Sequence, residues 1–327
     1  MLAYIARRLV AMVIMMFLIS IASFVIIQLP PGDFLTTYVA SQEQGSSVSI
    51  QQIEFLKQKY GLDQPFYVQY WRWISGIVFN GDFGYSFNWD KPVSELIWGQ
   101  LGFTLLLSVA TLLFAWAVSF PIGVYSAVKQ YSIGDYIVSF IGFIGLAIPN
   151  FLLALVLMYI GFKYFGQSVG GLFSPEYRDA PFSLGKLWDL FKHLWVPIIV
   201  IGTAQTAELI RIMRANLLDE LNKPYVTTAR AKGMSEIRLI FKYPIRIALN
   251  PFVSTVGWVL PNLVSGAVIV SVVLNLPTVG PLLLNSLQSQ DMYLAGAFIL
   301  LLSVLTLVGT IVSDILLALL DPRIKLE

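Results

Sequence analysis

Long uncharged, apolar segments alternate with shorter polar segments along the whole chain. Six of the apolar segments have roughly the 17–25 residues that a helix needs to cross the hydrocarbon core of a bilayer, or more. They cover residues 9–30, 96–128, 136–162, 194–210, 251–274 and 292–313, and of these only 194–210 contains a charged residue, Glu208. This pattern predicts an all-α membrane protein with six transmembrane helices.

One polar, basic segment, residues 222–251, stands out between the apolar ones. Its helix breakers are Pro224, Gly233, Pro244 and Pro251. Between the breakers the sequence predicts two short helices, residues 225–232 and 235–243. The second helix has apolar residues at i, i+3 and i+4, which predicts one apolar face made of Ile237, Ile240 and Phe241. A loop between spans needs no such helix pair unless the pair docks on something.

The longest polar region, residues 31–95, separates the first span (residues 1–30) from the remaining five (residues 96–327). Ser49 and Gln52 have the spacing of a helix capping box. Pro65 opens a second helical pattern, which is dense in aromatic residues. That density suits a helix at a membrane–water interface, and an ordinary packed cap is the alternative.

The composition is that of a membrane protein, and the distribution of charge indicates its orientation in the membrane. Hydrophobic residues make up 57% of the chain and charged residues 12%, against roughly 25% charged in soluble domains. With a cytoplasmic N-terminus, the inner segments carry more Lys and Arg than the longer outer segments, as the positive-inside rule requires. We therefore expect both termini and residues 222–251 in the cytoplasm, and residues 31–95 outside.

The chain lacks the residues that several kinds of chemistry require. No stretch of the chain has the Gly-x-x-x-x-Gly-Lys-Ser/Thr pattern of a phosphate-binding loop. The chain has no Cys and one His, so no metal cluster built on these residues is expected. His193 is expected to be a solvated residue near a span end. No charge falls in the middle of a span, which argues against an ion-driven carrier. The energy for any transport must then come from elsewhere.

Irregular backbone inside two spans suggests a polar path. Proline and asparagine fall near the centres of the spans at residues 136–162 and 251–274, and such breaks are tolerated where protein or water satisfies the backbone. The hypothesis is a translocation path lined by Asn150, Gln205, Pro261 and Asn262. A helix-packing kink is the alternative at each position.

Residues 225–233 resemble the coupling loop of the permease subunits of dipeptide/oligopeptide-type ATP-binding-cassette importers. The general pattern there is Glu-Ala-Ala, three residues, then Gly. Here Thr227 and Thr228 replace the first two residues, while Ala229 and Gly233 match. Further similar stretches are Pro31-Gly32-Asp33, Gly61-Leu62-Asp63-Gln64-Pro65, Gly81-Asp82-Phe83-Gly84, Ile148-Pro149 and Ala318-Leu319-Leu320-Asp321-Pro322-Arg323.

The resemblance implies the fold of a type I importer permease, which is not itself an enzyme, in the plasma (inner) membrane of a prokaryote. It implies three kinds of partner besides the lipid bilayer: a second homologous permease subunit, two cytoplasmic ATPase subunits that hold ATP and Mg, and an external substrate-binding protein. No nucleic acid and no cofactor in this chain are implied. The residues expected to contact the ATPase are Tyr225, Thr227, Thr228, Ala229, Arg230, Ala231, Lys232 and Gly233.

The substrate stays open between peptides, oligosaccharides and metal complexes, because no residue distinguishes them. Two other classes of function also stay open. A stand-alone channel or secondary carrier predicts flux through this chain alone, together with inverted repeats, which the sequence does not display. A structural membrane scaffold predicts no dependence of any flux on residues 222–251.

Overall fold

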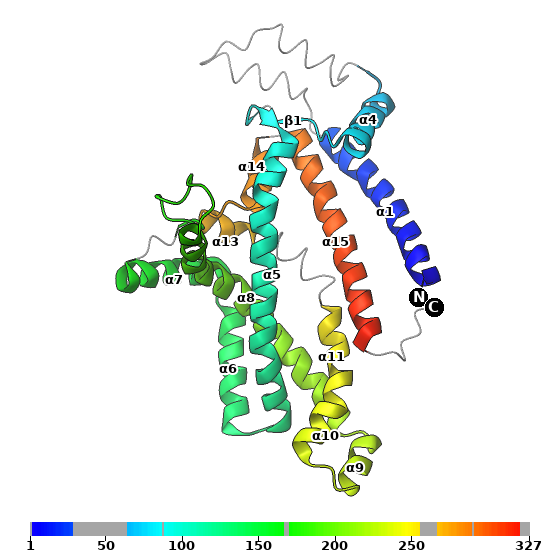
Figure 1. The fold of residues 1–327 in the computed structure, drawn as a ribbon, viewed down its shortest axis with the longest axis vertical. Coiled ribbons are helices and arrows are strands. Elements are labelled where there is room, and N and C mark those ends of the chain that lie inside the picture. The colour runs from blue at the N-terminus through cyan, green and yellow to red at the C-terminus, as the bar shows by residue number, and fades with distance from the viewer. Residues whose placement is uncertain are drawn as a thin grey trace. The chain divides into compact units, whose positions relative to one another are not determined.

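The computed structural model describes residues 2–28, 64–86, 88–166, 170–255, 267–289 and 291–320. These residues form two compact units. The larger unit contains Phe103–Pro277 and Thr306–Glu327, and the smaller unit contains Leu2–Gly102 and Thr278–Leu305. Figure 1 shows that the described secondary structure is almost entirely helical.

Among the described residues, the larger unit is built from long helices followed by four short ones. Its elements in chain order are α5 (Val93–Val128, which begins in the smaller unit), α6 (Ile133–Ala147), α7 (Asn150–Phe165), α8 (Leu184–Leu221), α9 (Pro224–Ala231), α10 (Glu236–Lys242), α11 (Pro244–Ser254) and α13 (Val268–Val273). Helix α8 packs against α6, α7 and α11. It is therefore the central element of this unit.

The smaller unit combines helices with one short hairpin. Its elements are α1 (Leu2–Gln28), α4 (Phe66–Ser75), the π-helix η1 (Gly76–Asn80), β1 (Tyr85–Ser86), β2 (Lys91–Pro92), α14 (Val279–Gln288) and the first part of α15 (Met292–Leu320). The hairpin pairs Tyr85 with Pro92. The Ser86 hydroxyl donates to the buried Asp291 carboxylate, and Asn88 donates to Asn285, so the hairpin is held to α14 and the start of α15.

Three described helices, α5, α8 and α15, are long and apolar enough to cross a membrane. The pair α6 and α7 would count as a fourth span if it crosses as one bent unit, and α1 carries a shorter apolar stretch, Val10–Ile26. Residues 29–63 and 256–266 lie outside the described residues, and with them the capping box at Ser49. Six spans therefore remain a prediction.

The span expected at residues 136–162 is not one straight helix. It breaks between α6 and α7 with a bend of 101°, and Figure 1 shows the two helices running in different directions. Ile148 has extended backbone, with φ −79° and ψ 123°. The cause is Pro149, because the ring of a proline disfavours helical geometry in the residue before it.

Two proline positions were also misread from the sequence. We expected the polar loop to reach Pro251, yet α11 already begins at Pro244 and contains Pro251. A proline fits the first position of a helix because the amide it lacks would have no helical partner there. In the same way Pro281 lies in the first turn of α14 (Val279–Gln288).

His193 is not the solvated residue expected from the sequence. It lies within α8, which starts at Leu184 rather than near residue 194, and only 4% of it is exposed. Its Nδ1 lies 2.8 Å from the carbonyl oxygen of Asp189, one turn earlier. Asp189 in turn accepts hydrogen bonds from the amide and hydroxyl of Ser174, both at 2.7 Å. Helix α8 thus holds the preceding loop through buried polar contacts.

Candidate coupling site

The element formed by α9, Gly233 and α10, here called the coupling element (residues 224–242), confirms the predicted pair of short helices. Helix α9 ends in a Schellman motif: the amide of Gly233 donates to the carbonyl of Arg230 at 3.0 Å, and the amide of Met234 donates to that of Ala229 at 3.3 Å. Gly233 has φ +77°, a conformation that costs a residue with a Cβ about 1–2 kcal/mol.

An ion pair closes the turn from outside. The Arg230 guanidinium donates to both carboxylate oxygens of Glu236, which is the first residue of α10. Both side chains are about half exposed. The hydrogen bonds from Arg230 lower the pKa of Glu236. Arg230, one of the residues expected to contact the ATPase, thus also links the two helices of the element.

The apolar residues of α10 divide between two sides. Leu239 and Ile240 are buried, while Ile237 and Phe241 are exposed by 76% and 55%. Of the predicted apolar face, Ile240 packs inward together with Leu239, while Ile237 and Phe241 stay exposed. Two exposed apolar side chains one helical turn apart remain on the surface of the coupling element.

The start of α9 is held by Tyr225. Its hydroxyl donates to Glu220 on α8 at 2.6 Å, and its ring lies edge-on to Tyr243, with centroids 6.4 Å apart. Burial, followed by this hydrogen bond, raises the pKa of Tyr225. Next along α9, Val226 is fully buried and Thr227 is exposed. Helix α9 therefore has one side anchored to the protein and one side free for contact.

The coupling element shares a hydrophobic core with the long helices. This core includes Val226 of α9 and Leu239 of α10, and it continues into α5, α8 and α11 through Ala115, Ala127, Leu209, Met213, Leu217, Ile245, Ala248 and Phe252. A Cβ on Gly123 of α5 would come within 2.7 Å of the Met213 Cβ. Helices α5 and α8 are thus in very close contact beside the coupling element.

A buried ion pair, which the sequence analysis missed, fixes α6 to α8. The Arg214 guanidinium donates from Nε and Nη2 to the two carboxylate oxygens of Asp135, at 3.1 and 3.0 Å. Asp135 is only 2% exposed and also accepts from the Ser126 hydroxyl and the Tyr131 amide. The spacing of Ser132 and Asp135, which forms a helix cap, was the sequence signal for the start of α6.

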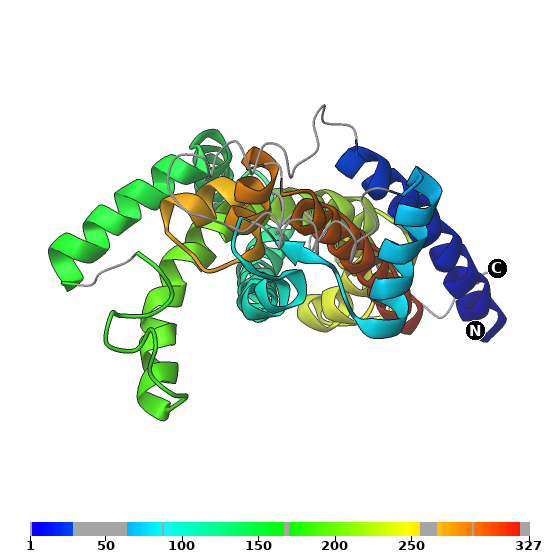
Figure 2. The ribbon, with the colours of Figure 1, turned by 90° about the horizontal axis from the view of Figure 1, so that it is seen from above.

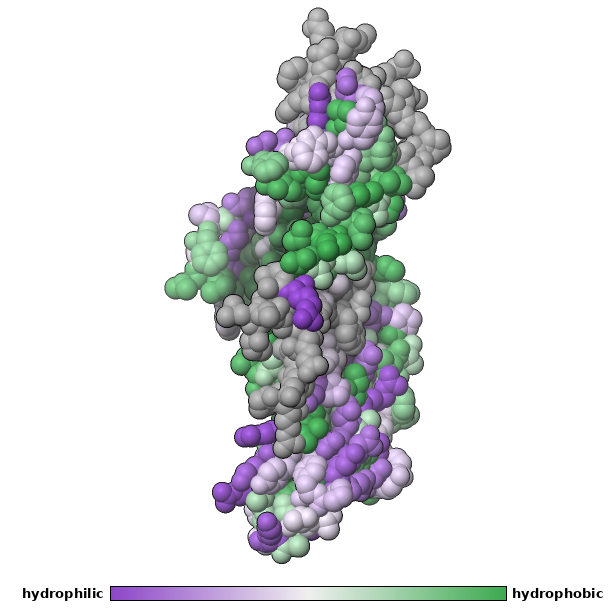
Figure 3. Space-filling model, turned by 90° about the vertical axis from the view of Figure 1, so that its right-hand side faces the viewer, coloured by the Kyte–Doolittle hydropathy of each residue, from purple (hydrophilic) through white to green (hydrophobic). Residues whose placement is uncertain are grey.

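The exposed surface of the coupling element is polar and largely basic. Figure 3 shows hydrophilic side chains gathered at the bottom of the view, where α9 and α10 lie. The exposed charged residues there are Lys223, Arg230, Lys232, Glu236, Arg238 and Lys242. Ile237 and Phe241 are thus apolar contacts within a charged surface.

The residues proposed to line a path are only partly described. Asn150 is the first residue of α7, half-buried, and Gln205 lies within α8, which packs against α7. The Oε1 atom of Gln205 is buried and has no hydrogen-bond partner among the described residues. Pro261 and Asn262 lie outside the described residues, so their part of the hypothesis has no structural account.

Comparison with known proteins defines the class. Residues 119–326 match the family "Binding-protein-dependent transport system inner membrane component", and residues 1–108 match the corresponding N-terminal family. The chain therefore belongs to this family of transport permeases, and it is a multi-pass membrane protein. Its resemblance to the permease subunits of peptide-type ATP-binding-cassette importers is confirmed.

Individual relatives are similar over their whole length. The oligopeptide transport system permease protein AppB of Bacillus subtilis is 39% identical over 99% of both chains. The dipeptide transport system permease protein DppB of Alkalihalophilus pseudofirmus is 31% identical over 99% of this chain and all of that one. The glutathione transport system permease protein GsiC of Escherichia coli is 32% identical over 99% of both.

One solved structure is also similar. An inward-facing form of the MetNI methionine ABC transporter overlaps 67% of this chain and 93% of that chain, with a TM-score of 0.48 and 17% sequence identity.

Proposed function

We propose that this permease subunit imports peptides and that its coupling element receives the motion of a partner ATPase. The exposed Ile237 and Phe241, 76% and 55% exposed on α10, carry the proposal. Exposed apolar side chains surrounded by charged ones are typical of a protein contact site. The relatives named for oligopeptide, dipeptide and glutathione transport support peptides as the substrate class.

The packing supports a mechanism in which this contact moves the long helices as one body. Helices α9 and α10 share their core with α5, α8 and α11, and Arg214 holds α6 to α8. Packed cores shift between discrete arrangements rather than deforming continuously. A displacement of the coupling element by the ATPase would therefore be passed to α5, α6, α8 and α11.

The remaining parts of the assembly follow from the same proposal. A second homologous permease completes the path, two cytoplasmic ATPase subunits hold ATP and Mg and carry out the hydrolysis, and an external binding protein delivers the substrate at residues 31–95. Both termini of this chain are cytoplasmic. The excess of Lys and Arg in the inner segments supports this orientation.

Asn150 and Gln205 are the described residues proposed for the translocation path. Pro261 and Asn262, which lie outside the described residues, belong to the same proposal. The buried, unpartnered Oε1 of Gln205 supports a wet site, because a buried polar atom without a partner is costly unless water reaches it. The chain has no Cys, so single Cys substitutions at Asn150, Gln205 and Asn262 are directly readable. Failure of a water-soluble thiol reagent to label any of them, in any transport state, would exclude the path.

The test is transport by the full assembly in liposomes, with ATP hydrolysis and peptide uptake measured together. Ile237→Asp and Phe241→Asp should each leave the subunit inserted and reduce ATP-dependent uptake at least tenfold, the effect of losing about 1.4 kcal/mol of contact. Leu184→Asp, at an 85% exposed position at the opposite end of α8, is the matched control. Normal uptake in both variants would contradict the proposal, and uptake by this chain alone would favour a channel or carrier.

A further inference from the structure

Helix α4 and the following η1 have one face packed inside the smaller unit. This packed face consists of Phe66, Tyr70, Trp73, Ile74 and Ile77. The ring of Phe24 on α1 lies 5.0 Å from that of Phe66, 5.5 Å from that of Tyr70 and 5.6 Å from that of Trp73. The Ser20 hydroxyl also hydrogen-bonds that of Tyr70 at 2.8 Å. Helices α1 and α4 accordingly lie side by side in both ribbon views (Figure 1 and Figure 2).

A second face of the same segment is apolar and exposed. Tyr67 is 72% exposed, and Trp71 and Val78 are 65% exposed. At about 100° per residue, Tyr67 and Trp71 lie on one side of α4, and Val78 follows in the π-helix η1. This strip, called the aromatic strip (Tyr67, Trp71 and Val78), borders the packed face that holds α4 to α1.

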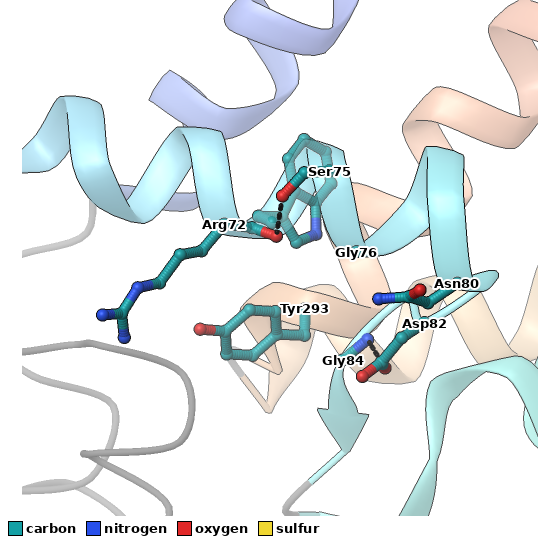
Figure 4. Close-up of a pocket in the computed structure, with 8 residues that line it drawn as sticks. Arg72, Ser75, Gly76, Asn80, Asp82, Gly84 and Tyr293 are labelled. Carbon is teal, nitrogen blue, oxygen red and sulfur yellow. Dashed lines mark hydrogen bonds between the residues drawn. The ribbon is translucent and has the colours of Figure 1, made fainter.

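A third face is polar. It carries Gln69, Arg72, Ser75 and Asn80, and part of it lines a pocket of about 290 Å³ with Asp82 and Tyr293. Figure 4 shows the Tyr293 ring between Arg72 and the turn at Gly84. The Asp82 carboxylate accepts a hydrogen bond from the Gly84 amide at 2.9 Å. The surface of α4 that is not packed is thus divided into an apolar aromatic side and a polar side.

The position of α4 along α1 indicates what covers the aromatic strip. The apolar stretch of α1 runs from Val10 to Ile26, and its exposed side chains include those of Val13 and Phe17. Exposed apolar side chains on a membrane helix are suited to contact with lipid. Helix α4 packs on α1 at Ser20 and Phe24, near the end of that stretch. If α1 contacts lipid along this stretch, the adjoining aromatic strip lies near the level where hydrocarbon gives way to headgroups.

We propose that the aromatic strip is a membrane contact, and that α4 lies in the interfacial region of the bilayer with its polar face toward water. Tyr and Trp are enriched at this depth because their rings are apolar and their tips form hydrogen bonds. A helix lying in the interface needs an apolar side and a polar side, and both are present on α4. The contact would set the depth of the segment that follows α1.

Spin labels test this proposal in the full assembly reconstituted in lipid nanodiscs. Since the chain has no Cys, single variants Tyr67→Cys, Trp71→Cys and Val78→Cys can each be labelled. Collision with oxygen, which concentrates in lipid, is compared with collision with a water-soluble nickel complex. Arg72→Cys, beside Trp71 but on the polar face, is the matched control. The oxygen-to-nickel ratio should be several-fold higher on the strip than at Arg72.

Two results would overturn the proposal. A strip with the same ratio as Arg72→Cys would place the aromatic residues in water. A strip protected from both reagents would show that a protein partner covers it, especially if protection appears only when an external binding protein is added. If Trp71→Cys lowers the yield of assembled complex, Val78→Cys, the smaller change, decides the question.

Discussion

Single residues decide whether the coupling element keeps its shape. Gly233 takes a left-handed backbone conformation, and the hydrogen bonds at Arg230 and Ala229 around it define how α9 turns into α10. A Cβ built on Gly233 would meet no atom within 4 Å. The requirement for glycine there is therefore one of backbone conformation and not of space.

Replacing Gly233 should uncouple the subunit in a way that depends on backbone preference. Gly233→Val should strain the turn by about 1–2 kcal/mol, leave the chain inserted, and lower the uptake per ATP hydrolysed. Gly233→Asn is the control, because asparagine tolerates the left-handed region. Coupled uptake by the reconstituted assembly is the measurement, and equal losses in both variants would argue against a conformational role.

The ion pair between Arg230 and Glu236 should make a small contribution to the stability of the fold, and this contribution should depend on pH. Its carboxylate has a lowered pKa, so its contribution is complete above the ordinary Glu pKa of 4.5 and is lost as the pH falls through the folded-state value. Salt should weaken it, because both side chains are exposed. A double-mutant cycle with Arg230→Ala and Glu236→Ala, followed by thermal unfolding at two salt concentrations, measures the coupling. A coupling unchanged by salt would contradict an exposed ion pair.

At the scale of elements, the contact between α6 and α8 contains an ion pair whose carboxylate, that of Asp135, is buried. Asp135 satisfies its carboxylate with Arg214, Ser126 and the Tyr131 amide. A buried carboxylate with this many partners is costly to disturb, because removing one partner leaves a buried charge without compensation. The pair thus holds α6 in place beside the helix that leads into α9.

Loss of that pair should destabilise the subunit more than loss of an exposed charge. Arg214→Ala should lower the free energy of unfolding by about 3 kcal/mol. This is the lower end of the range for a broken buried pair, because Arg214 keeps part of its surface in solvent. Asp219→Asn, an exposed position on the same helix, is the control and should change little. Thermal aggregation of the detergent-solubilised assembly compares them, and equal melting temperatures would contradict the prediction.

At the scale of the whole molecule, the unequal distribution of Lys and Arg is the basis for orientation. Lys232 and Arg238 belong to the coupling element, which is expected inside, whereas Asp90 lies in the β1–β2 hairpin of the region expected outside. The positive-inside rule reads basic residues in loops close to the spans, as these are. Orientation can therefore be tested at two points.

In intact spheroplasts, a membrane-impermeant thiol reagent should label Asp90→Cys. The same reagent should label Lys232→Cys only after the membrane is permeabilised, because residues 222–251 face the cytoplasm in this orientation. The chain without Cys is the blank for both variants. Labelling of Lys232→Cys in intact spheroplasts would show that the chain has the opposite orientation in the membrane.

The sequence by itself determined the class, most of the helices and the position of the coupling element. Runs of apolar residues and the breakers Pro224 and Gly233 act locally, through solvent transfer and backbone preference, so they can be read without the fold. Even the turn at Gly233 was predictable, because a Schellman motif depends on residues only a few positions apart.

Only the tertiary structure decided which side chains face inward. Leu239 and Ile237 are both apolar, yet one is buried and the other exposed, and that depends on where α8 and α11 lie. The Arg214–Asp135 pair joins residues 79 positions apart, and the burial of His193 depends on the full length of α8. Contacts between distant segments arise from packing, which no local pattern of residues records.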